Sequence, residues 1–456
     1  MVATFACLVV VGCSRPAPPS MRARPNVVLV VIDTLRADHL GAYGYARART
    51  ARLDAFAARG TRFGLARSTS SWTLPSTASI LTGRYPVDHG AERMTLKLNE
   101  KQLMLAEMLA AAGYDTAGFS ANAAVVTPES GFAQGFDRFD VLARRGDQSG
   151  ADPVWPSNEQ KPDATADVVT DAALEWVASR PTTNGPYFLY VHYFDPHSTY
   201  SPPPAYAEAF GVRSGDPLRG PAQALVMMKK ALAEHELATL RALYDAEIAF
   251  TDREIGRLLD GIGFGRRHDI IVVITSDHGE EFGEHGRMQH TKTLYEEVLR
   301  VPLLVGGADL PTGRVVEAPV SLVGVFPTIA ELAGVEVPSG LPGRSFVPVL
   351  RGAEPAPAPV FAELSWGRVH RAAVVDGSWK LLLDQGFVPT LYDLATDAGE
   401  TTPRNQNQAA RTGALQKAIG EHNKAGFRAR AAAPPVALAL DAERRERLRQ
   451  LGYVVD

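Results

Sequence analysis

The chain has 456 residues, of which 45% are hydrophobic, enough to bury a large core in one α/β domain with a smaller appended piece. Its formal net charge of −4 provides no basic surface, which excludes nucleic acid as the expected partner. No apolar run approaches the roughly twenty residues that a membrane-spanning helix needs.

The first segment, residues 1–24, has the pattern of a bacterial lipoprotein signal followed by a tether. The chain's two cysteines, Cys7 and Cys13, lie in it, and an apolar stretch with a small residue directly precedes Cys13. This pattern predicts an exported protein whose contact with the membrane at the cell envelope is a lipid anchor on Cys13. No Lys or Arg precedes the apolar run, however, and translation from Met21 would leave a cytoplasmic protein. Both interpretations stay open.

Strands and helices alternate along the rest of the chain. Residues 26–33, 187–194 and 269–277 are mostly apolar runs, the first and third rich in β-branched residues and the second in aromatic ones, which is typical of parallel strands covered on both faces. Helical patterns lie between them, for example at residues 100–112 and 234–260. The alternation predicts an α/β fold with a doubly wound, mostly parallel sheet flanked by helices.

Candidate ligands for a cation follow two of these strands. Asp33 ends the first run, and Asp277 with His278 ends the third. A strand-end Asp is often only the cap of the next helix, and a lone His is often a satisfied core residue. The carboxyl ends of parallel strands gather functional side chains, so the set favours a divalent-cation site. Carboxylate and imidazole together suit Ca, Mn or Zn, and the absence of a usable cysteine excludes a thiolate site.

A hydroxyl group is predicted at the N-terminus of a short helix. Pro75 favours the first turn of this helix and Gly83 provides its stop, so that Thr73 lies just outside the helix. Free amides and the positive end of the helix dipole suit an anionic group beside a nucleophilic hydroxyl. The simpler alternative is that Thr73 and Ser76 only cap the helix.

Residues 73–90 resemble the nucleophile segment of the sulfatase branch of the alkaline-phosphatase superfamily. The pattern of that family is Cys-x-Pro-Ser-Arg, followed by a short helix that ends in Thr-Gly-Arg. The chain has Thr-Leu-Pro-Ser-Thr at this point. The resemblance therefore assigns Thr73 to the nucleophile position and Thr77 to the arginine position. It covers about residues 25–402 and implies an alkaline-phosphatase-like fold.

Two further segments resemble the metal-binding segments of this family. The opening Pro-Asn-Val-Val-Leu-Val-Val-Ile-Asp-Thr is similar to a strand that ends in paired acids, and Ser-Asp-His-Gly-Glu is similar to the second metal-binding segment. The resemblance implies that Asp33, Asp277 and His278 bind a divalent cation beside Thr73. Thr34 occupies the position of the second acid of the pair, so that one ligand is missing or replaced by a hydroxyl.

Other positions of the resemblance concern the bound anion. His197 corresponds to the family's histidine that contacts the anionic group and the leaving oxygen. Two residues compete for the position of a later lysine: Lys292 has the amine but lies one residue too near the following tyrosine, whereas His290 has the expected spacing. Phe119 and Asn122 stand in place of a family lysine and histidine. The chain thus lacks cationic side chains with which the family usually binds sulfate.

The domain organisation follows from the same patterns. A catalytic domain is predicted at residues 25–335, a small C-terminal α+β subdomain at 336–402 and a helical tail at 403–456. Residues 371–383 have the pattern of a hairpin, with Asp376-Gly377 at its turn.

The chemistry must differ from that of ordinary sulfatases, which oxidise a cysteine or serine to formylglycine. Thr73 cannot form that aldehyde, because its β-carbon carries a methyl group. If Thr73 reacts, it attacks directly as a metal-bound alkoxide, and water or another alcohol then releases the adduct. Phosphoesterases, nucleotide pyrophosphatases and lipoteichoic-acid synthases of the superfamily use a threonine in this way.

We therefore expect a metal-dependent hydrolase of small anionic sulfate or phosphate esters. A phosphodiesterase or a transferase of a phosphoryl-linked headgroup is one alternative. A catalytically silent, anion-binding lipoprotein is another, in view of the substitutions at Thr34, Thr77, Phe119 and Asn122. A purely structural lipoprotein is disfavoured because Asp33 and the Asp277-His278 pair are intact.

Overall fold

A computed structural model describes residues 24–143, 164–181, 185–220, 222–229, 231–307, 309–384 and 388–450. The predicted lipoprotein signal, with Cys13 and Met21, lies outside the described residues.

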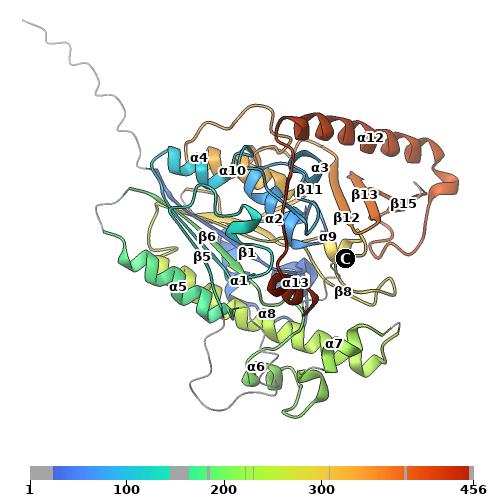
Figure 1. Cartoon of the computed structure of the whole chain (residues 1–456), viewed down its shortest axis with the longest axis horizontal. Helices are drawn as coiled ribbons and strands as arrows, with labels where there is room; N and C mark the ends of the chain where they lie inside the picture. Colours follow the sequence, from blue (N-terminus) through green and yellow to red (C-terminus); the bar gives the residue numbers. More distant parts are fainter. Residues whose placement is uncertain are drawn as a thin grey trace, which may run out of the picture.

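A mixed sheet of eight strands forms the centre of the molecule (Figure 1). Strand β10 is antiparallel to β7 and β2, and the other neighbours are parallel, which confirms the predicted fold class. In sheet order the strands are β11 (Arg314–Ser321), β2 (Thr61–Arg67), β10 (Leu303–Gly307), β7 (Ile270–Ser276), β1 (Asn26–Ile32), β6 (Tyr187–Tyr193), β4 (Asp115–Ser120) and β5 (Arg138–Val141).

The three predicted strands are the central β1, β6 and β7, and every residue in them is buried. Both faces of this part of the sheet are covered, as their continuous apolar runs require. Ile32 pairs with Ser276 on one side and with Tyr193 on the other. The register therefore brings the residues that follow β1 and β7 to the same edge of the sheet.

Helices cover both faces of the sheet, and Figure 1 shows α1, α5 and α8 on one side and α2, α4 and α10 on the other. The first group is α1 (Ala51–Arg59), α5 (Ala166–Ser179) and α8 (Glu234–Ile262). The second is α2 (Thr73–Thr82), α4 (Leu105–Ala111) and α10 (Val325–Leu332). The arrangement is a three-layer α/β fold.

Two helix starts differ from the prediction. Helix α4 begins at Leu105 and not at residue 100, because the Asn99 side chain closes a turn by accepting from the Lys101 amide at 2.9 Å. Glu107 provides the cap instead, accepting from the Met104 amide at 2.7 Å. Helix α2 begins at Thr73 itself, and Gly83 ends it with φ of 67° as predicted.

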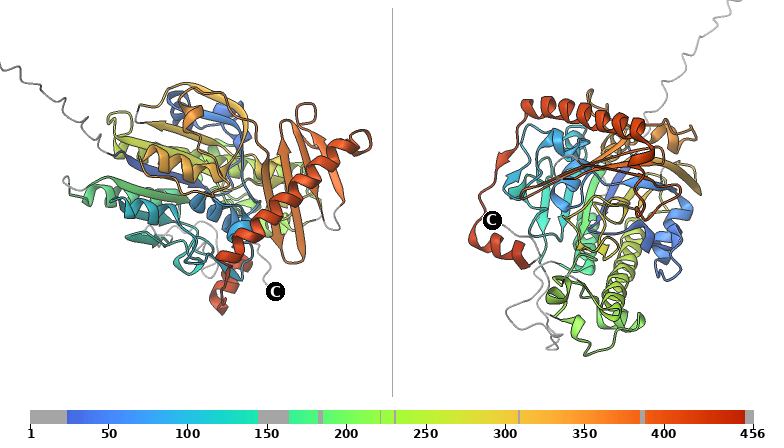
Figure 2. Two further views of the ribbon diagram at one scale, coloured as in Figure 1. Left: turned by 90° about the horizontal axis from the view of Figure 1, so that it is seen from above. Right: turned by 90° about the vertical axis from the view of Figure 1, so that its right-hand side faces the viewer.

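A separate antiparallel sheet lies beyond the central one. It consists of β12 (Val360–Trp366), β13 (Val369–Asp376), β14 (Trp379–Leu383) and β15 (Pro389–Asp393). Strands β13 and β14 form the predicted hairpin, with Gly377 at φ of 62° in the turn. Helix α12 (Ala409–Ala432) crosses this sheet (Figure 2) and buries Leu415 and Ile419 against it. The predicted tail segment thus packs on the small sheet.

The remaining elements are short or peripheral. The helices are α3 (Pro86–His89), α6 (Pro204–Ala209), α7 (Ala222–Met227), α9 (Glu296–Leu299), α11 (Val347–Leu350) and α13 (Ala442–Gln450). The short strands are β3 (Leu96–Lys97), β8 (Glu281–Phe282), β9 (Met288–Gln289) and β16 (Val436–Ala437). The 3₁₀ helices are η1 (Ala37–His39), η2 (Gly41–Tyr43), η3 (Pro128–Ser130), η4 (Pro217–Arg219), η5 (Leu322–Gly324) and η6 (Asn405–Asn407).

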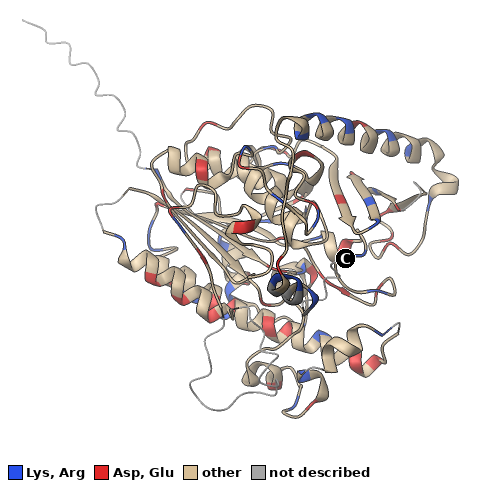
Figure 3. Cartoon of the chain, in the orientation of Figure 1, with Lys and Arg blue, Asp and Glu red and all other residues tan. Residues whose placement is uncertain are grey.

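Acidic and basic side chains occur together on α8, whereas α12 carries mainly basic side chains (Figure 3). Within the described residues, no helix combines the length and the apolar composition that crossing a bilayer requires.

Candidate active site

Three of the predicted ligands converge at the carboxyl ends of β1 and β7. Asp33, Asp277 and His278 each offer a ligand atom, and these atoms lie within 4.8 Å of one another. His278 Nε2 is 3.7 Å from Asp33 Oδ1 and 3.5 Å from Asp277 Oδ2. All three side chains are completely buried. The sheet register therefore assembles the predicted cluster.

The protonation of His278 suits a metal ligand. Its Nδ1 lies 2.9 Å from the carbonyl oxygen of Gly279, and this atom must carry the proton to donate there. Nε2 then carries no proton. Its lone pair can bind a metal ion, and it faces the two carboxylates. A backbone hydrogen bond that fixes the ring in this way is the usual support for a metal-bound histidine.

The carboxylates of Asp33 and Asp277 are buried, and each has one oxygen without a hydrogen-bond donor among the described residues. Asp33 Oδ1 and Asp277 Oδ2 accept no hydrogen bond from any residue that the structure describes. Burial and the charge of Asp33 raise the pKa of Asp277 to about 6. Burial acts in the same sense on Asp33, but a hydrogen bond to His192 and nearby imidazoles hold the pKa of Asp33 below its usual range. A divalent cation fits this set, since it would bind both bare oxygens and offset the repulsion.

Thr73 lies beside this cluster. It is the first residue of α2, it is completely buried, and its Oγ1 is 3.3 Å from His278 Nε2. The N-terminal amides of the helix and its dipole favour negative charge at this point. The Thr73 hydroxyl and the cluster of predicted metal ligands therefore share one site.

Thr34 shows what has replaced the expected second acid. It has φ of 56°, and its amide donates to Asp277 Oδ1 at 3.2 Å. Its Oγ1 and the Oγ1 of Thr77 are buried and have no hydrogen-bond partner among the described residues. These two positions thus bring neutral hydroxyl groups to places where the resemblance implies an acid and an arginine.

The predicted anion-contacting residues form a group of imidazoles next to the cluster. The ring of His290 meets the ring of His278 at 4.6 Å and that of His197 at 4.9 Å, measured between centroids. His197 Nδ1 lies 2.6 Å from the carbonyl oxygen of Ser198, and His290 Nδ1 lies 3.0 Å from Glu280 Oε1. Burial lowers the pKa of His197 to about 4 and that of His290 below its ordinary value.

Lys292 is directed elsewhere. Its ammonium group donates to the carbonyl oxygen of Met288 at 2.8 Å, and burial lowers its pKa. Of the two residues that competed for one role, His290 is thus the one whose ring contacts both His278 and His197.

His192 is a site residue that the sequence analysis missed. It lies in the apolar run of β6, and its Nε2 is 3.3 Å from Asp33 Oδ2. Tyr190 donates its hydroxyl to His192 Nδ1 at 2.8 Å, which leaves the Nε2 proton for Asp33. The available signal was an imidazole near the end of a strand that is otherwise fully buried and apolar.

Asn122 contributes more than the loss of a cation. It follows β4, and its amide donates to Asp33 Oδ2 at 2.9 Å. Phe119 is buried within β4, with the Arg138 guanidinium carbon 5.3 Å from its ring centroid. Asn122 therefore helps to orient Asp33, whereas Phe119 brings no polar group to the site.

Comparison with known proteins finds similarity to sulfatases over most of the chain. The family model described as Sulfatase matches residues 25–335, and the model described as the C-terminal part of N-sulphoglucosamine sulphohydrolase matches residues 283–419. An ulvan-active sulfatase of Formosa agariphila is 27% identical over 348 residues, which are 73% of this chain and 66% of that protein.

Two further similarities concern proteins that are not described as sulfatases. A multifunctional alkaline phosphatase superfamily protein of Trinickia caryophylli is 26% identical over 73% of this chain and 78% of its own length. The crystal structure of a phosphonate monoester hydrolase of Agrobacterium radiobacter matches with a TM-score of 0.70 and 24% identity. The match covers 92% of this chain and 99% of that one, and it shows that the two chains share a fold.

Proposed function

Because the chain belongs to the sulfatase family of hydrolases, we propose that it is a divalent-metal-dependent hydrolase of sulfate or phosphate esters with Thr73 as its direct nucleophile. The observation that carries this proposal is the 3.3 Å distance between Thr73 Oγ1 and His278 Nε2, at the N-terminus of α2 and beside two bare carboxylate oxygens.

The residues fit a cation held by Asp33, Asp277 and His278. When bound, it supplies Lewis acidity that lowers the pKa of a neighbouring hydroxyl and stabilises charge on the ester oxygens. Asn122 and His192 orient Asp33 through their hydrogen bonds to its Oδ2. The Thr34 amide orients Asp277 in the same way.

The reaction then has two displacements. The Thr73 oxygen attacks sulfur or phosphorus and loses its proton, the ester bond to the alcohol breaks, and the alcohol leaves with a proton. In the second step water attacks the sulfur or phosphorus, the bond to the Thr73 oxygen breaks, the sulfate or phosphate product leaves, and a proton from the water restores the hydroxyl. Burial lowers the pKa of His197 and of His290, which favours their uncharged imidazoles, and we assign these two residues to hold the leaving oxygen and to move these protons.

The charge of the site favours singly charged esters. Thr77 and Phe119 stand where the family has an arginine and a lysine, and the amine of Lys292 is bonded to a backbone carbonyl. A doubly charged phosphate monoester would therefore meet too little positive charge. Sulfate monoesters, phosphate diesters and phosphonate monoesters each carry one negative charge. We include phosphorus esters because the relative from Trinickia caryophylli is described as a multifunctional protein of the alkaline phosphatase superfamily.

A silent anion-binding protein is the second candidate, and the neutral residues at positions 34, 77, 119 and 122 favour it. One experiment separates the two. A sulfate monoester, a phosphate monoester and a phosphate diester of the same chromogenic alcohol are offered to the chelated protein, with and without Ca²⁺, Mn²⁺ or Zn²⁺. The proposal predicts turnover of the singly charged esters that a cation restores. Absence of turnover with all three esters and all three cations would support the silent alternative.

The predicted location also belongs to this proposal. The sequence pattern before Cys13 supports an exported chain with a lipid anchor. Replacing Cys13 with serine should then move the protein from the membrane fraction to the soluble fraction. An unchanged distribution would favour translation from Met21.

A further inference from the structure

A second group of acidic and imidazole side chains lies apart from the candidate active site. His285, Glu297 and Glu400 offer ligand atoms that all lie within 4.8 Å of one another. They come from the loop after β8, from α9 and from the segment after β15. His285 Nε2 is 3.5 Å from Glu297 Oε2. The group therefore joins the catalytic domain to the C-terminal part of the chain.

A fourth acid, Glu281, lies near His285 and Glu297 of this group. Glu281 in β8 is completely buried, and neither of its carboxylate oxygens accepts a hydrogen bond from any described residue. A buried carboxylate in this state lacks the cation or donor that would stabilise its charge.

Two basic residues near this group, Lys380 and Arg67, already form ion pairs with acidic side chains. Lys380 Nζ is 3.0 Å from Glu296 Oε1 and 2.9 Å from Glu400 Oε1, and Arg67 makes a further ion pair with Glu296 at 2.8 Å. These two cations balance Glu296 and Glu400. His285 Nε2 lies 3.5 Å from Glu297 Oε2, and Lys292, whose ammonium group donates to the Met288 carbonyl oxygen, interacts electrostatically with Glu281. The group has room for additional positive charge.

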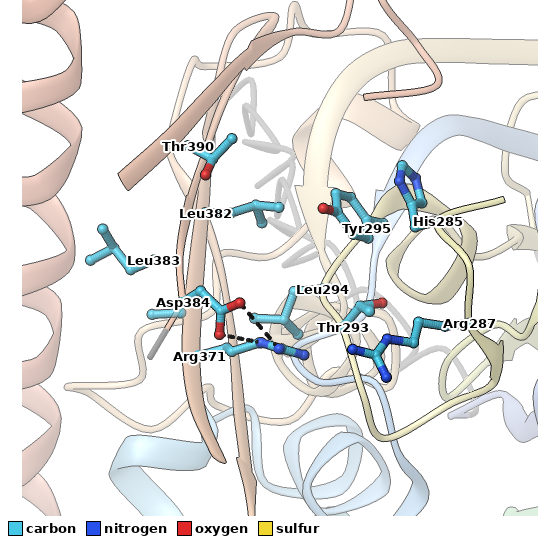
Figure 4. Close-up of a pocket in the computed structure, with 11 residues that line it drawn as sticks. His285, Arg287, Thr293, Leu294, Tyr295, Arg371, Leu382, Leu383, Asp384 and Thr390 are labelled. Carbon is cyan, nitrogen blue, oxygen red and sulfur yellow. Dashed lines mark hydrogen bonds and ion pairs between the residues drawn. The ribbon is translucent and has the colours of Figure 1, made fainter. Parts of the chain in front are cut away.

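Of this group, His285 lines a pocket of about 200 Å³. His285, Thr293 and Tyr295 line one side of it, and Arg371 and Thr390 of the small sheet line the other (Figure 4). His285 stacks on Tyr295 with 3.5 Å between ring centroids, so its ring is held in a fixed orientation. The His285 imidazole is thus the part of the group that borders the pocket.

We propose that His285, Glu297 and Glu400, with Glu281 as the fourth ligand, form a second site for a divalent metal ion that fastens the catalytic domain to the C-terminal subdomain. One imidazole nitrogen and three carboxylate oxygens suit Zn²⁺ or Mn²⁺, whereas Ca²⁺ prefers oxygen ligands alone. Four protein ligands leave no open position, which is typical of a structural site. The proposal does not depend on chemistry at Thr73.

Zinc content tests this proposal directly. The full chain is stripped with a chelator, loaded with excess Zn²⁺, separated from free metal by gel filtration and analysed for zinc per chain. Glu297→Gln and His285→Gln should each hold one zinc ion fewer than the wild type. Glu284→Gln is the matched control, because Glu284 lies in the same loop but pairs with Arg36 at 2.7 Å. It should keep the wild-type zinc content.

A second measurement separates this site from the active site and guards against misfolding. Asp277→Asn, which removes a ligand of the other cluster, should still show a rise in Tm on addition of Zn²⁺. The double variant Asp277→Asn/Glu297→Gln should show none, while its circular dichroism without metal matches that of Asp277→Asn. Wild-type zinc content in both Glu297→Gln and His285→Gln would overturn the proposal, as would an unchanged zinc response of the double variant.

Discussion

Two groups of buried charge, one at the sheet edge and one between the domains, are built on opposite principles. In the sheet-edge group, Asp33 and Asp277 each keep an oxygen without a hydrogen-bond partner among the described residues. In the interdomain group, Glu296 accepts from Arg67 and from Lys380, and Lys380 also pairs with Glu400. The sheet-edge group leaves charge unbalanced, whereas the ion pairs of Glu296 with Arg67 and Lys380 balance charge within the protein.

This difference separates binding from stability. An unbalanced buried carboxylate costs folding free energy, and its retention is explained when a bound cation offsets the cost. A balanced group loses stability when one partner is removed, because the other charge is then buried alone. Substitutions in the two groups should therefore have opposite consequences for activity and stability.

The largest effect is expected at Asp277. Asp277→Asn removes a proposed metal ligand, and the loss of several kcal/mol of charge stabilisation corresponds to a fall in kcat/KM of at least about a thousandfold. The same change removes the repulsion between Asp277 and Asp33, so the Tm of the chelated protein should not fall. Assays of turnover and of thermal unfolding on one preparation check both parts.

Glu296 should behave in the opposite way. Glu296→Gln leaves Arg67 and Lys380 without their shared carboxylate and should lower the free energy of unfolding by about 3–5 kcal/mol. Turnover per folded molecule should stay within a few-fold of the wild type. Glu317→Gln is the control, since Glu317 is 63% exposed and pairs with Arg62 at 3.5 Å. Its loss should cost less than about 1 kcal/mol in urea unfolding.

Glu296 should also affect how the stability of the protein falls at acidic pH. Although burial alone would raise the pKa of Glu296, Arg67 and Lys380 hold it below the ordinary value of 4.5. The stability that Glu296 contributes is thus present above pH 4.5 and lost as the pH falls through its lowered pKa. Between pH 5 and pH 3, wild type should lose stability more steeply than Glu296→Gln. Parallel curves would contradict this assignment.

A smaller effect is expected at His192. His192→Ala removes one donor to Asp33 but none of the proposed ligands, so metal affinity should fall by about 10- to 100-fold. Excess metal should restore turnover in this variant and not in Asp277→Asn. A His192→Ala protein with unchanged metal affinity would show that Asn122 alone is sufficient to orient Asp33.

The sequence predicted the parts of the site that depend on short segments. Asp33, Asp277 and His278 directly follow apolar strands, and parallel strands bring their carboxyl ends to one edge. His192 could not be predicted in this way, because its contact with Asp33 depends on which strand lies next to β1. The pairing of Lys380 with Glu296 joins positions far apart in the chain, and no local pattern encodes it. The start of α4 was wrong because turn and cap signals lie close together before that helix.

The central claim is that the hydroxyl of Thr73 attacks the ester, and turnover by Thr73→Ala tests it most directly. With the metal that best activates the wild type, and with a folded variant shown by circular dichroism, the account predicts a loss of at least about a thousandfold in kcat. Thr73→Ser, which keeps the oxygen, should retain measurable turnover. Wild-type turnover by Thr73→Ala would contradict the account.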